Sequence, residues 1–224
     1  MSAAGSGPAA APLLVACALR IEQAALRSGA RGARGAAPPG YAVLRTGMGP
    51  RAAERAVGRA LGEPGLRGAA VLATGFCAGL VPGMSPGDLI VAEETRDPRG
   101  TVACAGTALL AEALARAAPG RTVHVGALTG SDHVVRGQER AQLRATGAIG
   151  VDMESAATLW TATRGSATAG AGRPVAAVRV IVDAPEHELV RIGTVRGGIS
   201  AFRVLRAVLP AFHDWHRSLL LPRR

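Results

Sequence analysis

The chain has 224 residues, a length that suits a single α/β domain. Hydrophobic residues make up 48% of the sequence but aromatic residues only 3%, so the core must be built from alanine, valine and leucine. The net charge of +10 rests on arginine alone, because the sequence contains no lysine. These arginines are dispersed and have few aromatic residues between them, which predicts a solvated basic surface and argues against a specific nucleic-acid site.

The cysteines Cys17, Cys77 and Cys104 form no CxxC pair. An odd, sparse set of cysteines predicts a reducing compartment and argues against a disulfide framework or a metal site. Residues 1–12 lack a basic segment, and the apolar run at 13–19 is too short for a signal core or a membrane span. We therefore expect a flexible leader at 1–12 and a cytoplasmic protein.

Short apolar runs alternate along the chain with alanine- and arginine-rich segments of helical periodicity. Strands are expected at 12–18, 41–46, 69–74, 88–93, 122–129, 148–151 and 175–182. Helices are expected at 50–62, 106–118, 137–146, 152–164 and 199–220. The stretches 27–40 and 163–174 are expected to be surface loops.

Strands that are apolar on both faces and separated by helices indicate a sheet buried between helical layers. The sequence therefore predicts an α/β fold, a three-layer α/β/α sandwich around a twisted, mainly parallel (mixed) central sheet. Residues 13–224 form a single domain in this prediction, and an amphipathic helix at about 199–220 ends it. Ligands are expected at the carboxyl ends of the strands.

Three acids each follow a predicted strand. Glu22 comes after the first strand, Glu154 after the strand at 148–151, and Asp183 after the strand at 175–182. Glu154 and Asp183 are separated by about one βαβ unit of ~30 residues, so their strands are expected to be neighbours that present both acids to one crevice. The alternative for each acid alone is a helix N-cap or first-turn residue, and for Asp152 we prefer that structural role.

Glycine-rich turns are expected to complete the rim of this crevice. The stretch TGMGP at 46–50 follows a strand and opens a helix, which leaves backbone N–H groups free to meet an anion or a hydroxyl. The stretch ATGFCAGL at 73–80 is expected to repeat this arrangement after the next strand.

The order of TGMG, ATGFCAGLVPGMSPGDLIV, VDMESAA and VRVIVDAPE resembles the nucleoside phosphorylase and nucleosidase superfamily, over residues 13 to 190. Its members cleave the N-glycosidic bond of purine or pyrimidine nucleosides. The stretches RGQERAQLRATGAIGVDMESAA and DAPE are most similar to hopanoid-associated nucleosidases, which remove adenine from adenosylhopane. The resemblance implies a phosphorylase/hydrolase-like fold, no cofactor and no metal, phosphate as an alternative co-substrate, and a homo-oligomer, in relatives usually a dimer or larger.

The resemblance also implies roles for individual residues. Asp183 and Glu22 would be catalytic: Asp183 would protonate N7 of the leaving purine, and Glu22 would orient or deprotonate the attacking water. Glu154 would accept hydrogen bonds from the ribose hydroxyls, and Met153 would line the apolar face of the sugar. The remaining substrate-binding residues would shape the pocket around the ribose, the nucleophile and the base: Gly49, Thr74, Gly75, Phe76 and Val182.

The chemistry needs two carboxyl groups in different protonation states. A general acid at N7 contributes ~10²–10⁴-fold to the rate, and a partly desolvated carboxyl at an apolar strand end can hold that proton. Glu154 must stay ionised to accept charge-assisted hydrogen bonds from the vicinal hydroxyls of the ribose.

The sequence departs from the family pattern at the pocket. Val182 replaces the serine that commonly precedes the catalytic acid, and Phe76 occupies a place usually small. The loop at 130–137 offers His133 where an aromatic side chain often stacks on the base. Ala73 stands where phosphorolytic relatives carry an arginine, so water is the expected nucleophile, with Arg20 or Arg45 as the residues that could still bind phosphate.

The segment at 199–220 carries an apolar stripe with interspersed arginines and histidines. Such a stripe usually covers a core. The alternative is an interfacial helix that rests on an anionic membrane, which a lipid-linked substrate would make useful. Pro210 is expected to kink or interrupt the helix.

The sequence thus predicts a purine nucleosidase or nucleoside phosphorylase that releases adenine from a 5′-substituted adenosine, with adenosylhopane as the expected substrate. A 5′-methylthioadenosine/S-adenosylhomocysteine nucleosidase and a futalosine hydrolase are the alternatives within the family. A basic α/β binding protein without catalysis is the alternative of another class.

Overall fold

The computed structural model describes residues 11–32, 40–164, 172–185 and 193–220. Three predicted segments lie partly outside these ranges: residues 1–10 of the leader expected at 1–12, residues 33–39 of the loop expected at 27–40, and residues 165–171 of the loop expected at 163–174. The strands are β1 (Leu13–Cys17), β2 (Tyr41–Arg45), β3 (Ala70–Gly79), β4 (Leu89–Asp97), β5 (Gly100–Ala103), β6 (Val123–Gly130), β7 (Ala148–Asp152) and β8 (Val175–Asp183). The helices are α1 (Arg20–Gly32), α2 (Pro50–Gly62), α3 (Thr107–Ala117), α4 (Gln138–Ala145), α5 (Ser155–Arg164), α6 (Gly193–Ala207) and α7 (Leu209–Leu219).

Five of the strands form a closed ring in which each strand is hydrogen-bonded to two others. β3 pairs with β8 in parallel, β8 with β4 antiparallel, β4 with β6 in parallel, β6 with β7 in parallel, and β7 returns to β3 antiparallel. β1 and then β2 extend the sheet in parallel from β3, and β5 adds an antiparallel edge to β4. The predicted α/β fold with a mixed central sheet is confirmed.

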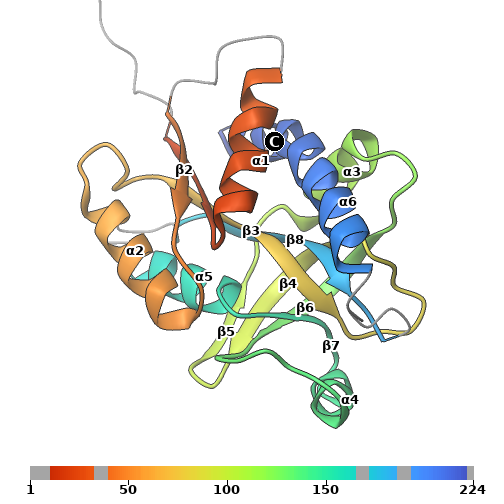
Figure 1. The fold of residues 1–224 in the computed structure, drawn as a ribbon. Helices are drawn as coiled ribbons and strands as arrows, with labels where there is room; N and C mark the ends of the chain where they lie inside the picture. The colour runs from red at the N-terminus through yellow and green to blue at the C-terminus, as the bar shows by residue number, and fades with distance from the viewer. Residues whose placement is uncertain (1–10, 33–39, 165–171, 186–192, 221–224) are drawn as a thin grey trace, which may run out of the picture.

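Helices cover the sheet on two sides, as Figure 1 shows for α1 and α6 on one side and α2 and α5 on the other. Side chains alternate between these layers along β1. Leu13, Val15 and Cys17 pack with α1, α3, α6 and α7, whereas Leu14 and Ala16 pack with α2 and α5. This alternation follows from the two-residue period of a strand, and it explains why β1 is apolar throughout.

The sequence prediction was wrong about where β3 ends. The glycine-rich stretch at 73–80 is not a turn, because the strand continues to Gly79. Gly75 lies at φ +136°, and a Cβ built on it would come within 2.5 Å of the Glu22 carboxylate. The glycine is therefore required where a side chain packs directly against the strand backbone, rather than for a turn.

The structure also contains a helix that the sequence did not predict. α1 begins at Arg20 and includes residues 27–32, which were expected to be loop. Its start has no serine, threonine or aspartate cap. Instead, Glu22 reaches back and accepts hydrogen bonds from the backbone N–H groups of Ala18 and Leu19, which is half of a capping box. Strand β5 was missed as well, because it has only four residues.

The expected C-terminal helix is two helices, with the break at Val208 and Pro210 in the first turn of α7. Its apolar stripe belongs to the core, which is the use that the sequence favoured. The stripe residues Leu205, Leu209, Phe212 and Trp215 are at most 1% exposed. The alternative, that this stripe rests on a membrane, is wrong for these side chains. No helix within the described ranges has the length and apolar character needed to cross a bilayer.

Candidate active site

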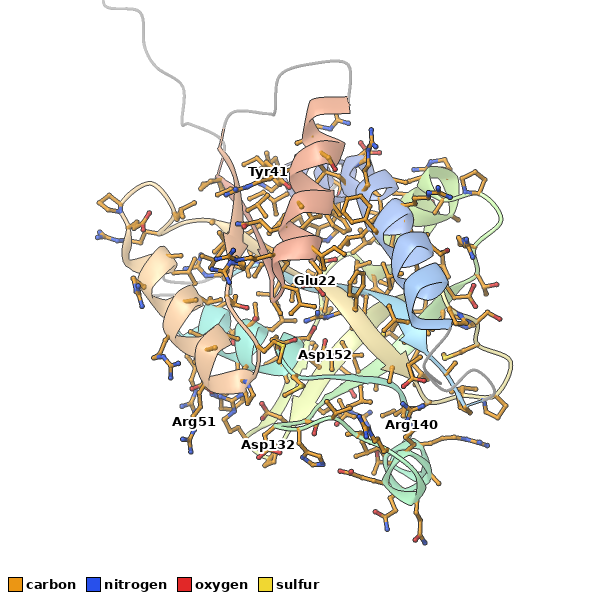
Figure 2. The ribbon with its side chains drawn as sticks, in the orientation of Figure 1. Glu22, Tyr41, Arg51, Asp132, Arg140 and Asp152 are labelled. Carbon is orange, nitrogen blue, oxygen red and sulfur yellow. The ribbon has the colours of Figure 1, made fainter. Side chains whose placement is uncertain are left out.

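A pocket of about 220 Å³ opens where α1, the end of β3, the β7–α5 junction and the end of β8 meet. Glu22, Glu154 and Asp183 all line it, so the structure brings the three predicted acids together. In Figure 2, Glu22 lies at the lower end of α1, close to Asp152 in the centre of the molecule, while Arg140 projects from α4. Met153, Phe76 and Val182 line the same pocket.

The strand pairings that bring these acids to one pocket differ from the predicted ones. β7 and β8 are not neighbours, because each pairs with β3 instead. Ala78, in the unpredicted extension of β3, faces Val151 of β7 on one side and Asp183 of β8 on the other. The ends of β7 and β8 therefore lie on opposite sides of the last residues of β3.

Glu22 is 2% exposed and its carboxylate is held at both oxygens. One oxygen accepts the Ala18 and Leu19 N–H groups, and the other accepts the Phe76 N–H at 2.8 Å. Burial raises the pKa of Glu22, while the Arg179 guanidinium and the three backbone donors oppose the shift. Glu22 is thus a base that is fixed in position and more basic than a solvated glutamate.

Glu154 lies at the start of α5 and is bound to the loop at 46–50. Its Oε1 accepts the N–H of Gly49 at 2.8 Å. Gly49 has φ +88°, a conformation that glycine adopts without strain, and this aims the N–H at the carboxylate. Burial raises the pKa of Glu154; Arg179 lowers it, and Asp152 raises it further.

Asp152 has the capping role that we preferred for it. Its Oδ1 accepts the N–H groups of Glu154 and Ser155 at 3.0 and 2.9 Å, which caps the start of α5. The other oxygen, Oδ2, lies 2.5 Å from Nε of Arg179. The acid therefore also helps to place a buried cation beside the pocket.

Arg179 is one of two arginines at the site that sequence reasoning missed. It is 1% exposed in the middle of β8 and contacts groups from three elements. Its Nη1 donates to the carbonyl of Thr74 at 3.0 Å, its Nε donates to Ser155 Oγ at 2.8 Å, and its Nη2 lies 4.0 Å from Glu154. The available signal was a single arginine inside the otherwise apolar run at 175–182, since a buried arginine needs anionic partners.

The surroundings of Asp183 also differ from the expected ones. An apolar strand end was predicted, but the Arg140 side chain forms an ion pair and hydrogen bond with Asp183 Oδ2. Arg140 comes from α4, where its Nε also donates to the carbonyl of Val135 at 3.3 Å. With arginine at so many positions, nothing in the sequence distinguished this one.

Other predicted residues take backbone or peripheral positions. The side chain of Thr74 does not line the pocket, since the residue is fully buried. Gly75 lies against Glu22, and Arg20 and Arg45 are exposed and do not line the pocket. His133 does line it, and hydrogen bonds to Asp132 and Glu139 raise its pKa.

The arrangement suits chemistry on a polar, hydroxyl-bearing ligand with an apolar body. Two buried carboxylates can accept hydrogen bonds and stabilise a developing positive charge, while most of the surrounding wall is apolar. Among the residues in the described ranges, no three His, Cys, Asp or Glu side chains are grouped to hold a metal ion.

Comparison with known proteins gives a family and a set of similar folds. The family model for the phosphorylase superfamily matches residues 37–210. No protein with a curated description matches the sequence.

Among solved structures, a point mutant of the Helicobacter pylori MTAN with 5′-methylthioadenosine in its active site has a TM-score of 0.73, with 16% identity over 91% of this chain and 98% of its own. The Neisseria meningitidis 5′-methylthioadenosine/S-adenosylhomocysteine nucleosidase, in complex with methylthio-immucillin-A, has a TM-score of 0.69, with 20% identity over 93% and 99%. The Helicobacter pylori futalosine hydrolase has a TM-score of 0.72, with 15% identity over 92% and 98%.

Proposed function

We propose, from the premise that this chain belongs to the phosphorylase superfamily and is a nucleosidase or nucleoside phosphorylase, that it releases adenine from a 5′-substituted adenosine. The observation that supports this reaction is the convergence of Glu22, Glu154 and Asp183 in one pocket. Three carboxyl groups suit N-glycosidic cleavage, which needs an activated nucleophile, a stabilised sugar cation and a neutralised leaving base.

Each acid then has a task. Glu154 accepts hydrogen bonds from the ribose hydroxyls, and Met153 packs on the sugar. Glu22 takes a proton from the attacking water, a role for which its raised pKa and fixed position suit it. Asp183 faces the base, with Phe76 and Val182 as apolar neighbours.

Water is the proposed nucleophile. Arg20 and Arg45, the two arginines that could have bound phosphate, do not line the pocket. Arg179 lines no part of it either, and its guanidinium is already engaged with Thr74, Ser155 and Asp152. Among the described residues, the one arginine that does line the pocket, Arg140, is paired with Asp183. A phosphate dianion would therefore enter a site where Glu22 and Glu154 repel it.

The proposed 5′ substituent is apolar, with adenosylhopane as the leading candidate in hopanoid lipid biosynthesis. Met48 and Val134 line the pocket yet are 65% and 63% exposed, which leaves apolar surface at its mouth. Methylthioadenosine and futalosine are the alternatives, because similar structures include enzymes named for them. A cytoplasmic homodimer, with peripheral membrane contact during turnover, completes the proposal.

The test is base release, measured by HPLC, from adenosylhopane, methylthioadenosine and futalosine, each with and without phosphate. We expect adenine from at least one adenosine substrate at a rate that phosphate leaves unchanged. Glu154→Gln should lower kcat/KM by ~10²-fold or more, because a neutral amide cannot form charge-assisted hydrogen bonds with the ribose hydroxyls.

The control is Glu112→Gln on the exposed face of α3, which should retain wild-type activity. No base released from any of these nucleosides, under any condition, would remove the proposed function. Release that occurs only with phosphate would replace water by phosphate as the nucleophile.

A further inference from the structure

The opening of the pocket carries large apolar side chains that face solvent. Met48 and Val134 line the pocket and are 65% and 63% exposed, and Ile21, next to the buried Glu22 in α1, is 47% exposed. These are three of the six large hydrophobic side chains that are exposed in the described part of the chain. Single exposed apolar side chains are normal, but a group of them around one opening indicates an interaction surface.

Exposed arginines accompany these side chains. Arg20 precedes Ile21 at the start of α1. Arg45 stands three residues before Met48, and Arg51 stands three residues after it. Figure 2 shows Arg51 pointing away from the body of the molecule at the start of α2. Within the described ranges, none of these three arginines forms an ion pair. We call six residues the mouth surface: Arg20, Ile21, Arg45, Met48, Arg51 and Val134.

Nearby acids do not neutralise the charge of the mouth surface. Asp132 and Glu139 are both hydrogen-bonded to His133, at 2.7 and 3.0 Å. His133 lowers the pKa of Asp132, and Arg51 adds to that shift from beyond ion-pair distance. The positive charge of the mouth surface is therefore available to an anion outside the protein.

The loops that carry most of the mouth surface are fixed to each other. β1 and β2 run in parallel with Cys17 beside Arg45, and the N–H of Thr46 donates to the carbonyl of Cys17 at 2.8 Å. The loop after β2 is held again where the N–H of Gly49 binds Glu154. The arginines and apolar side chains thus stand on a preformed surface that adjoins the pocket.

We propose that the mouth surface docks on an anionic phospholipid bilayer, with its three arginines at the phosphate headgroups and its three apolar side chains in the layer beneath them. Basic side chains next to exposed apolar ones are typical of proteins that bind the membrane interface without crossing it. The inference deepens the proposed function and rests on it, since docking would bring a lipid-linked adenosine to the opening of the pocket.

Two other partners match only part of the mouth surface. A nucleic acid offers phosphates but no apolar layer for isoleucine, methionine and valine side chains. A second copy related by two-fold symmetry would bring the same unpaired arginines close to one another. A bilayer with anionic lipids carries negative charge at its surface and hydrocarbon below it, so it meets both kinds of side chain.

The test is sedimentation with vesicles, either of phosphatidylcholine alone or of phosphatidylcholine and phosphatidylglycerol in equal parts. The mouth variant combines Arg20→Gln, Arg45→Gln and Arg51→Gln. The matched control removes the same amount of charge from exposed positions of α3 and α6, and it combines Arg116→Gln, Arg203→Gln and Arg206→Gln. A third variant, Ile21→Ser with Met48→Ser, removes apolar side chains. Circular dichroism establishes that each variant is folded.

We expect the wild type to bind the vesicles that contain phosphatidylglycerol and not those of phosphatidylcholine alone. The mouth variant should weaken this binding by ~100-fold, because each arginine near an anionic surface contributes ~5-fold. The charge-matched control should change it by less than about threefold, since distant charges are screened. Ile21→Ser with Met48→Ser should weaken it by ~5- to 50-fold, and this loss should persist at high salt.

Several results would overturn the inference. They are no binding of the wild type to anionic vesicles, equal binding to both kinds of vesicle, and an equal loss in the mouth variant and its control. Loss of duplex DNA binding in the mouth variant, with vesicle binding retained, would assign the surface to nucleic acid instead. Conversion of an oligomer to a monomer by Ile21→Ser with Met48→Ser, again with vesicle binding retained, would assign it to a second copy.

The remaining outcomes separate this inference from the proposed function. If the mouth variant does not fold, Ile21→Ser with Met48→Ser decides, and unchanged vesicle binding overturns the inference. Base release by the wild type is measured without vesicles. Release without vesicle binding removes the docking surface and keeps the proposed function. Vesicle binding that depends on the mouth surface, without release of any base, removes the proposed function and keeps the docking surface.

Discussion

Arg179 is the cation on which the buried acids of the site depend. Glu22, Asp152 and Glu154 all interact with it, and the three acids outnumber it. Burial alone would favour the protonated form of Glu22 and Glu154, whereas the catalytic roles proposed for them need the ionised form. The guanidinium balances part of the negative charge that these acids place next to an apolar pocket.

Replacing this cation should destabilise the fold in a pH-dependent way. Arg179→Met leaves the acids buried and unpaired, and should lower the free energy of unfolding by about 3–5 kcal/mol at neutral pH. The pKa values of Glu22 and Glu154, already raised in the folded state, should rise further. A raised carboxyl pKa favours the folded state below the unfolded pKa, and this contribution is lost as pH rises through the folded pKa.

The deficit of Arg179→Met relative to the wild type should therefore shrink as pH falls from 8 toward 5, and urea unfolding at several pH values measures it. Arg203→Met, at an exposed position of α6, is the control and should stay within about 0.5 kcal/mol of the wild type. An equal deficit at every pH would mean that Arg179 contributes through packing and not through charge.

At the scale of the element, the extension of β3 beyond residue 74 organises the site. Its backbone supplies the Phe76 N–H to Glu22, and Ala78 aligns the ends of β7 and β8. The close approach of Glu22 to this backbone is possible because residue 75 has no side chain.

Gly75→Ala should disrupt that approach. The added Cβ would lie 2.5 Å from Glu22 Oε1 and 2.7 Å from Arg179 Nη1, at a φ of +136° that alanine rarely adopts. We expect a loss of about 1–3 kcal/mol in the free energy of unfolding, and a larger loss of activity because Glu22 must move. Denaturant unfolding and base release, measured on the same preparation, provide both numbers.

Gly58→Ala is the matched control for this substitution. Gly58 lies inside α2, and an added Cβ would meet Thr161 at an ordinary 3.8 Å. Alanine there should stabilise the helix by about 0.5–1 kcal/mol. If both variants behave alike, the glycine at position 75 is not required by a close approach.

Sequence patterns predicted the helices and strands better than the contacts between them. The apolar runs predicted seven of the strands, and α2 begins and ends at the predicted residues, since Pro50 and the alanine periodicity are local signals. The end of β3 and the ion pair of Arg140 depend on partners far along the chain, which no local pattern encodes. The start of α1 was missed for another reason, because Glu22 caps it where no serine, threonine or aspartate stands. The motifs around Glu154 and Asp183 predicted acids that line one pocket, but the pairing of Asp183 with Arg140 required coordinates.

At the scale of the whole molecule, α7 joins the two ends of the chain into one core. Phe212 and Trp215 pack in the same cluster as Leu13 of β1, Leu89 of β4 and Leu114 of α3. The indole N–H of Trp215 donates to the carbonyl of Ala105 at 2.7 Å, just before α3. The helix is therefore a structural part of the domain.

Trp215→Ala should accordingly destabilise the whole domain. Removing a fully buried tryptophan costs about 3–5 kcal/mol, and the carbonyl of Ala105 loses its partner as well. Trp215→Phe should retain most of the packing and lose about 1–3 kcal/mol, chiefly from the unpaired carbonyl. Denaturant unfolding measures both, with Leu109→Ala at a 54%-exposed position of α3 as the control that should change little.

The same variants test in solution the burial that excludes membrane contact for this apolar stripe. A stripe that covers the core makes Trp215→Ala unstable and leaves the binding of anionic vesicles by the folded fraction unchanged. A stripe that rests on a membrane would give the reverse, near-normal stability with weakened vesicle binding. Because the side chain is 1% exposed and hydrogen-bonded inside the domain, we expect the first result, and any membrane contact must then use other surfaces, such as Met48 and Val134 at the mouth of the pocket.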